Sequence, residues 1–204
     1  MSFCVVKIGG SLLENSREIV SNLVKLSSKE HGFLIIPGGG PMADLVRNLF
    51  LRYGLSQETA HWMAVLAMEQ YAYFMAEGGV ELTDDICKFS SGVRILLPYQ
   101  ALLSDDRGLE HNWDYTSDSV AAMISCRLGA EMVKVTDVDG IIIEGKVVDE
   151  ISSEELLGKE TCVDQGTLKI LNLHKGNCLV INGTNIPKFV DCLIRMDGGT
   201  LIRG

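Results

Sequence analysis

The chain has 204 residues, of which 47% are hydrophobic and 22% are charged, and its formal net charge is −9. This composition excludes an intrinsically disordered chain and predicts one folded domain with a sizeable core. The acidic balance argues against general binding to nucleic acids or membrane surfaces, so a site for a polyanion would need its own local donors.

Strands and helices alternate along the chain, and each is predicted from its apolar spacing and its flanking caps. In chain order, the pattern predicts a strand at residues 3–8, a helix capped by Ser16 and ended by Gly32, a strand at 33–36, helices at 42–53 and 57–77, and a strand at 93–97. It then predicts a helix capped by Ser117 that runs to 128, a strand at 131–136, a hairpin of 141–143 with 146–148, a helix at 165–174, a strand at 178–182, a helix at 187–196 and a strand at 200–203. Continuous apolar strands between helices predict an α/β fold with a mainly parallel sheet covered on both faces.

We predict neither a targeting segment nor a membrane span. The first ten residues read as a strand and a glycine loop, and the most apolar helical stretch, at 60–76, is interrupted by Glu69 and Gln70. The six cysteines form no Cys-x-x-Cys pair. We therefore expect reduced thiols in a cytoplasmic protein, and neither disulfides nor a zinc site.

The first strand is followed by a candidate phosphate loop. In parallel sheets of this kind, ligands bind at the carboxyl ends of the strands, and Lys7, Gly9, Gly10 and Ser11 stand at such an end. Two glycines let backbone N–H groups approach a phosphate, and a lysine adds a point charge. An ordinary strand-to-helix turn is the alternative, and the residues alone leave both interpretations open.

Three consecutive glycines, Gly38, Gly39 and Gly40, follow the second strand and open a helix. Such a run is costly in conformational entropy, and a helix N-terminus is a natural anion site. We interpret the run as a second phosphate-binding loop, with a flexible turn as the alternative. Neither glycine loop matches the P-loop or the dinucleotide-binding signature.

Three later features carry less information on their own. Asp118, after Thr116 and Ser117, falls in the first turn of a helix, where it could be a plain cap. The segment Thr136-Asp137-Val138-Asp139-Gly140 follows a strand and by itself indicates only a turn. Lys169 by itself is an exposed helical lysine.

Taken in order, these pieces resemble the amino acid kinase family, which includes acetylglutamate, aspartate, uridylate and isopentenyl phosphate kinases. The motifs are Lys-Ile-Gly-Gly-Ser, Pro-Gly-Gly-Gly-Pro, Thr-Ser-Asp-Ser-x-Ala-Ala, Thr-Asp-Val-Asp-Gly and a late lysine, and the resemblance spans Lys7 to Thr200. It implies a three-layer αβα sandwich, one kinase domain over residues 1–204, and a homo-oligomer that binds ATP and a small-molecule acceptor.

Within the family, the chain is similar to the short archaeal kinases of methanofuran biosynthesis. Those enzymes phosphorylate (5-(aminomethyl)furan-3-yl)methyl phosphate to the diphosphate. The similarity rests on the compact length, on Trp-Asp-x-Thr-Ser-Asp-Ser, on the helix with His61-Trp62-Met63, and on Asn182-Gly183-Thr184. The resemblance therefore implies a phosphate group as the acceptor.

Other members of the family are alternatives. Uridylate kinases usually carry a methionine-glycine-rich segment where this chain has His61-Trp62-Met63-Ala64. Isopentenyl phosphate kinases usually carry a Phe-Gly-His segment, and aspartokinases carry regulatory domains for which 204 residues leave no room. A non-catalytic nucleotide-binding or storage protein on the same fold is the alternative from another class, and the presence of both Lys7 and Asp118 argues against it.

The resemblance implies a role for each matched residue on the nucleotide side. Lys7 resembles the lysine that contacts the transferring phosphoryl group, and the loop at 9–11 resembles the one around the β- and γ-phosphates of ATP. The segment at 136–140 resembles the segment around the nucleotide. ATP and Mg²⁺ are the implied cofactors, and no side chain is implied as a metal ligand.

On the acceptor side, the glycine loop at 38–40 resembles the acceptor loop, with Thr116 and Ser117 as further substrate-binding residues. Asp118 resembles the aspartate that orients two catalytic lysines. Many members carry the second of these lysines in a Gly-Gly-Met-x-x-Lys-like segment, which here reads Asp-Gln-Gly-Thr-Leu-Lys. Lys169 is therefore the candidate, with altered spacing, and Lys175 is the alternative. The candidates for binding an acceptor phosphate are Arg47, Arg52 and Arg94.

Overall fold

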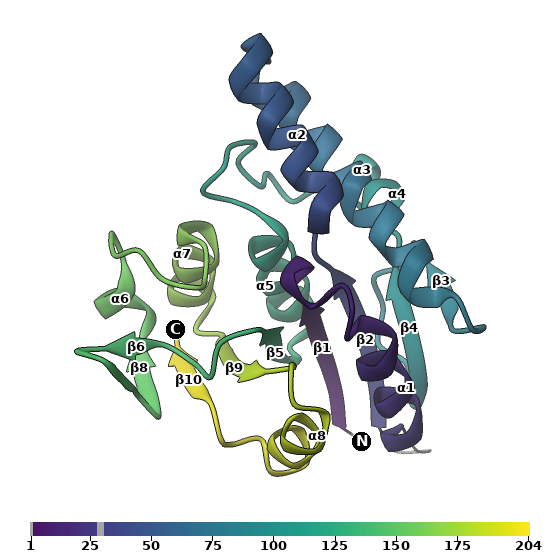
Figure 1. Ribbon diagram of the computed structural model, residues 1–204, viewed down its shortest axis with the longest axis vertical. Helices are drawn as coiled ribbons and strands as arrows, with labels where there is room; N and C mark the ends of the chain where they lie inside the picture. Colours follow the sequence, from purple (N-terminus) through teal and green to yellow (C-terminus); the bar gives the residue numbers. More distant parts are fainter. Residues whose placement is uncertain (1, 28–30) are drawn as a thin grey trace.

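A computed structural model describes residues 2–27 and 31–204, and its centre is an eight-stranded sheet in the order β3-β4-β2-β1-β5-β9-β10-β8 (Figure 1). The strands are β1 (Ser2–Ile8), β2 (His31–Pro37), β3 (Glu81–Thr83), β4 (Gly92–Leu96), β5 (Glu131–Thr136), β8 (Glu150–Ser152), β9 (Asn177–Asn182) and β10 (Thr200–Arg203), and β6 (Ile142–Ile143) and β7 (Lys146–Val147) form a separate hairpin. Within the eight-stranded sheet, the pairings are parallel except that of β9 with β10. This sheet confirms the predicted α/β fold.

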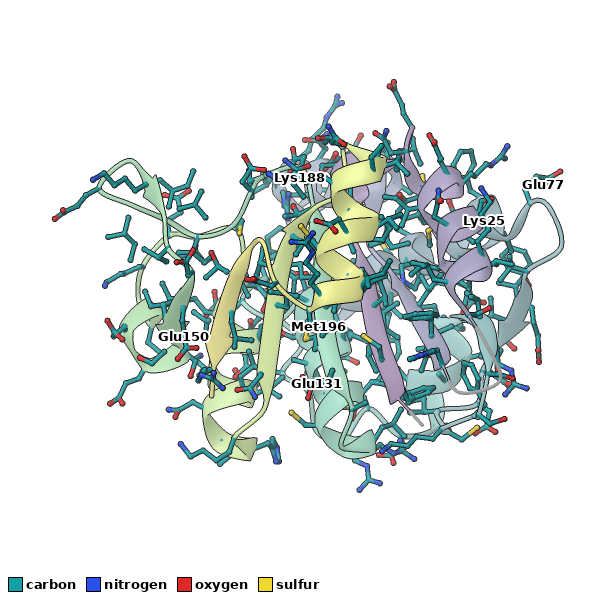
Figure 2. All side chains as sticks on the ribbon, turned by 90° about the horizontal axis from the view of Figure 1, so that it is seen from below. Lys25, Glu77, Glu131, Glu150, Lys188 and Met196 are labelled. Carbon is teal, nitrogen blue, oxygen red and sulfur yellow. The ribbon has the colours of Figure 1, made fainter. Side chains whose placement is uncertain are left out.

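Helices cover both faces of the sheet. They are α1 (Ser16–Leu26), α2 (Gly40–Tyr53), α3 (Gln57–Ala76), α4 (Pro98–Ser104), α5 (Ser117–Leu128), α6 (Ser153–Leu156), α7 (Gln165–His174) and α8 (Ile186–Arg195), with a 3₁₀ turn η1 (Gly10–Leu12) after β1. The helices α1 and α8 pack on one face, and α5 and α7 on the other. Figure 2 shows α8 lying across its face, with Lys188 and Met196 toward its two ends.

The central strands are apolar on both sides because both of their faces are covered. In β1, Val5 belongs to the core under α5 and α7, whereas Val6 belongs to the core under α1 and α8. In β2, Leu34 and Ile35 divide in the same way, and all four side chains are fully buried. Each such burial stabilises the fold by about 1.5–3 kcal/mol. This two-sided burial explains why the strands read as continuous apolar runs.

The first helix differs from its prediction at both ends. Ser16 is its first residue rather than its cap, and the Ser16 hydroxyl donates to the carbonyl of Leu13 over 2.8 Å. The helix ends at Leu26, while Gly32 lies inside β2, and residues 28–30 are outside the described part of the chain. A Cβ on Gly32 would lie 2.7 Å from the carbonyl oxygen of Phe89, so the glycine serves close packing and not a helix end.

Four short elements had no counterpart in the prediction: β3, α4, β8 and α6. The strand β4 ends at Leu96, and Pro98 opens α4 as a first-turn proline. Ser152 and Glu155 form a capping box at α6, which has only four residues. Among the described residues, we find no helix that is both long and apolar enough to cross a membrane.

Candidate active site

The carboxyl ends of β1, β2 and β5 bring the predicted loops together. These strands are adjacent and parallel, with Lys7 in register with Ile36 on one side and Lys134 on the other. The amide of Gly38 donates to the carbonyl of Ile8 over 2.9 Å, and the amide of Gly9 donates to that of Val135 over 2.9 Å. Both glycine loops are thereby fixed to the strand ends at one edge of the sheet.

The two glycine loops touch each other through backbone atoms. A Cβ on Gly10 would fall on the backbone nitrogen of Gly40, and a Cβ on Gly38 would lie 2.7 Å from the backbone nitrogen of Gly10. Gly40 also has a φ of +56°, a conformation that favours glycine, whereas Gly39 has an ordinary φ of −87°. Glycine is therefore required at these positions by contact and by backbone conformation, before any ligand is considered.

A buried cluster of three charges lies behind the loops. Asp118, in the first turn of α5, has one carboxylate oxygen 2.8 Å from Nζ of Lys7, and its other oxygen accepts a hydrogen bond from Nζ of Lys134. Nζ of Lys134 also donates to the carbonyl of Cys162. All three charged side chains are more than nine-tenths buried. With both lysines charged, the cluster carries a surplus of one positive charge.

Burial and mutual attraction compete within this cluster. Burial by itself would raise the pKa of Asp118, but Lys134 and Lys7 outweigh it and hold that pKa at about 2. Burial lowers the pKa of Lys7, an effect that Asp118 opposes and Lys134 reinforces. Burial opposes the charge of Lys134 as well, yet Asp118 dominates and raises its pKa. The carboxylate is therefore ionised at neutral pH, and the two lysines differ in how firmly they hold their protons.

The position of Asp118 is fixed by a second carboxylate, Asp164. One oxygen of Asp164 accepts from the amide and hydroxyl of Thr116 over 2.9 and 2.6 Å, and the other accepts from the Ser119 hydroxyl over 2.6 Å. Asp164 also caps α7 by accepting from the amide of Thr167 over 2.7 Å. One side chain thus joins the N-termini of α5 and α7. Asp164 was not among the predicted site residues, although an Asp before a helical segment is the usual sign of a cap.

The second predicted lysine lies elsewhere. Lys169 is exposed on α7, with Nζ 5.2 Å from the centroid of the Tyr115 ring, and Lys134 takes the place on Asp118 that the sequence analysis gave to Lys169. Lys175, the alternative, ends α7 at its far terminus and donates to Asn172 over 3.2 Å. The overlooked signal was Lys134 itself, a lysine in the middle of the apolar strand Met-Val-Lys-Val-Thr.

A cavity of about 390 Å³ opens beside the loops, between α2, α3 and the segment at 112–117. Gly10, Ser11, Gly39 and Gly40 line one side of it, and Thr116 and Ser117 line another. Of the three candidate arginines, Arg47 also lines the cavity. Arg94 pairs with Glu81 over 3.1 Å, and Arg52 lies over the ring of Tyr53.

Two residues that line this cavity, His61 and Trp113, each have a buried ring nitrogen without a hydrogen-bond partner among the described residues: Nε2 of His61 and Nε1 of Trp113. His61 stacks on His111 with ring centroids 3.9 Å apart, and its burial lowers its pKa to about 4, so that it is neutral at pH 7. The ring nitrogens of His111 face Glu58 at 2.5 Å and Asp106 at 2.9 Å. The cavity therefore offers neutral polar groups at its α3 side.

The predicted nucleotide segment lies at the same sheet edge, outside the lining of this cavity. The carbonyl of Thr136 accepts from the amide of Gly183 over 2.8 Å. The carboxylate of Asp139 accepts from Asn182 over 3.2 Å and from Lys188 over 2.9 Å. Asp137 and Val138 connect these two anchor points. The segment is thus held by β9 and α8, on the other side of β5 from β1.

Three groups of known proteins resemble the chain. The amino acid kinase family model matches residues 2–182. The chain is 33% identical over 201 residues to [5-(aminomethyl)furan-3-yl]methyl phosphate kinase of Methanocaldococcus jannaschii. The matched region covers 93% of this chain and 92% of that protein. It is 24% identical over 253 residues to acetylglutamate kinase of Bacillus cytotoxicus, covering 100% and 98%.

Solved structures share the fold. Uridylate kinase from Archaeoglobus fulgidus matches with a TM-score of 0.67 and 18% identity, covering 99% of this chain and 100% of that one. Aspartate kinase from Synechocystis matches with a TM-score of 0.70 and 12% identity, covering 100% of this chain and 40% of that one. At these identities, the likeness concerns the fold alone.

The contact between the glycine loops predicts the effect of a single methyl group. We expect Gly10→Ala to weaken binding of inorganic tripolyphosphate on the order of tenfold, because the loops must separate and at least one charge-assisted N–H bond is lost. Calorimetric titration measures this. Gly9→Ala is the matched control, since its Cβ would lie 3.2 Å from the carbonyl oxygen of Val135. Equal affinities of the two variants would contradict the prediction.

The His111 contacts predict a pH-dependent stability. Burial opposes the charge on His111, but Glu58 and Asp106 outweigh it and raise its pKa. A raised folded-state pKa stabilises the protein fully below the unfolded value, near 6.5, and the effect is lost as pH rises through the folded value. We expect His111→Gln to lower Tm by about 2 °C at pH 5.5 and by less at pH 9. His174→Gln, at the exposed end of α7, is the control. A Tm difference independent of pH would rule out this assignment.

Proposed function

The chain belongs to the amino acid kinase family and is an enzyme that phosphorylates a small molecule, and from that premise we propose its reaction and its acceptor. The reaction is transfer of the γ-phosphoryl group of ATP to the phosphate of a small phosphomonoester, which yields a diphosphate and ADP. The acceptor is [5-(aminomethyl)furan-3-yl]methyl phosphate, the compound named for the relative from Methanocaldococcus jannaschii.

The observation that carries this proposal is the buried charge cluster at the edge where the two glycine loops meet. Lys7 and Asp118 are 2.8 Å apart, and with both lysines charged the cluster keeps a surplus positive charge beside the two glycine loops. Phosphoryl transfer is accelerated by positioning and by stabilising charge on the moving group, more than by covalent catalysis. These residues supply both.

Each residue then has a part in the transfer. An oxygen of the acceptor phosphate attacks the γ-phosphorus, and the bond from that phosphorus to the β–γ bridging oxygen breaks, leaving ADP. Lys7 stabilises the charge on the transferring group, and Asp118 holds Lys7 in place. The loop at 9–11 binds the β- and γ-phosphates, and the segment at 136–140 binds the rest of the nucleotide. Lys169, near Tyr115 at the cavity, adds positive charge for the phosphates.

The acceptor phosphate binds on the other glycine loop. The N-terminus of α2, at 40–41, favours an anion, and Arg47 lies one to two turns further along the same helix and lines the cavity. Thr116 and Ser117 close the opposite side. An acceptor phosphate is already anionic, so its attack needs no general base. This agrees with the cavity lining, where the described carboxylate, Asp44, lies 3.8 Å from Arg47 and is 71% exposed.

The far side of the cavity suits a small ring that carries polar groups. Its lining is mainly apolar and aromatic, with Trp113 and Tyr115, and its volume of about 390 Å³ is at the small end for ligand sites. Asp44 supplies a negative charge that suits an aminomethyl cation. The side chains of His61 and Trp113, whose ring nitrogens are unpaired among the described residues, line this side.

Mg²⁺ has no protein-only site in the part of the chain that the structure describes, where we find no group of three His, Cys, Asp or Glu side chains able to hold a metal ion. We therefore propose that Mg²⁺ arrives with ATP and is held mainly by the phosphates. When bound, it would neutralise phosphate charge. None of the residue roles above depends on it.

Removing the Lys7 charge tests the reaction. We expect Lys7→Met to lower kcat on the order of a thousandfold, with a much smaller change in KM for ATP, because the lysine acts chiefly in the transition state. ADP formation with [5-(aminomethyl)furan-3-yl]methyl phosphate measures it. Lys25→Met, exposed on α1, is the control. The proposed acceptor fails if N-acetylglutamate or UMP is phosphorylated and this phosphomonoester is not.

Removing the Arg47 charge tests the acceptor side. We expect Arg47→Gln to raise KM for the acceptor about tenfold while KM for ATP stays unchanged, since one charge-assisted bond to the acceptor phosphate is lost. Arg52→Gln, on the same helix over Tyr53, is the matched control. Steady-state kinetics with each substrate varied separately distinguish the two effects. A rise in KM for ATP alone would reverse the assignment of the two sides.

A further inference from the structure

We propose that Lys134 is a positioning residue of the phosphoryl-transfer site, which fixes the Asp118 carboxylate and, through it, Lys7. The inference rests on the proposed function for its effect on turnover, but not for the coupling between the two lysines. Lys134 is 4% exposed, and its ammonium group is engaged by Asp118 and by the carbonyl of Cys162, so it acts through Asp118 and not by touching a substrate.

The register of the sheet makes this arrangement possible. Lys7 and Lys134 are paired across the adjacent parallel strands β1 and β5. In-register residues of parallel neighbours point to the same face about 4.8 Å apart. Two ammonium groups that are brought close together in a buried place repel each other unless an anion lies between them. Asp118 supplies that anion, with one oxygen toward each lysine.

With both of its oxygens engaged, Asp118 has a fixed orientation. A carboxylate held by Lys7 alone could rotate about its last bond and carry the ammonium group with it. Lys134 prevents this because it is anchored at a second point, the carbonyl of Cys162. That carbonyl stands two residues before Asp164, which joins α5 to α7. Lys134 and Asp164 therefore hold the start of α5 from two directions.

The charge balance argues against a purely structural purpose. Asp164 also acts on Lys7, and the thiols of Cys162 and Cys178 face Lys134. Burial raises the pKa of both thiols, to about 12 for Cys178, so they do not neutralise the lysine. Burying a second ammonium group beside the pair of Lys7 and Asp118 costs desolvation free energy. A core selected for stability alone would keep the pair of Lys7 and Asp118 and place an apolar side chain at 134.

The test is Lys134→Met, with Lys134→Gln as a second variant that keeps a hydrogen-bond donor without the charge. Both leave a neutral Lys7–Asp118 pair, so we expect Tm within a few degrees of the original protein. We expect kcat to fall on the order of a hundredfold, with KM for ATP changed much less. Lys134→Arg restores part of kcat if the charge is what matters. Lys146→Met, on the exposed hairpin, is the control.

A second measurement does not depend on turnover. The titration of Lys7 is followed by NMR with ¹³C-labelled lysine, the signal being assigned from its loss in Lys7→Met. We expect the midpoint of Lys7 to rise in Lys134→Met and Lys134→Gln, because a like charge has been removed. An unchanged midpoint, or a fall in kcat no larger than the loss of folded protein, overturns the proposal. If the original protein shows no turnover, the proposed function fails while the titration still decides the role of Lys134.

Discussion

The carboxylate of Asp118 is the constraint on which the site depends, because it lies between the ammonium groups of Lys7 and Lys134. Its place follows from the topology: β1 and β5 are adjacent, and α5 begins where it can reach both. The first turn of a helix also favours a negative charge. Backbone dipole, two cations and a buried setting all act on one side chain, and its pKa of about 2 reflects the two cations overcoming the burial.

The glycine loops are a second constraint, and it is steric. Strands β1 and β2 are neighbours in the sheet, so the turns that follow them must pass each other within backbone contact. Side chains at Gly10 or Gly38 would separate them. The same absence of side chains that allows this contact also exposes backbone amides to a ligand. Close packing and anion binding therefore both require glycine at these positions. For this reason the glycine run alone could not show whether the segment is a plain turn or a binding site.

Much of the fold could be predicted because the central strands are covered on both faces and therefore read as continuous apolar runs. The strands at 131–136 and 200–203 and the helix at 165–174 match the structure residue for residue. The short elements β3, β8 and α6, of three or four residues, were missed because they are too short for a period to appear. Gly32 was misread because glycine ends helices and also permits close packing, and only the packed neighbour, Phe89, distinguishes the two.

In the candidate site, the residues that follow strand ends could be predicted from the sequence. A residue whose neighbours are set by the register between two strands could not. Lys7 and Asp118 could be found from motifs, but Lys134 lies within a strand, and its meeting with Asp118 is decided by how β1 and β5 are aligned. The departure at 164–169 has a structural reason as well. A Cβ on Gly166 would fall on Ser119 and on the ring of Tyr115, so the first turn of α7 packs directly against α5. The first turn of α7 is therefore engaged in packing and in capping through Asp164. The second positive charge beside Asp118 comes instead from Lys134 in β5.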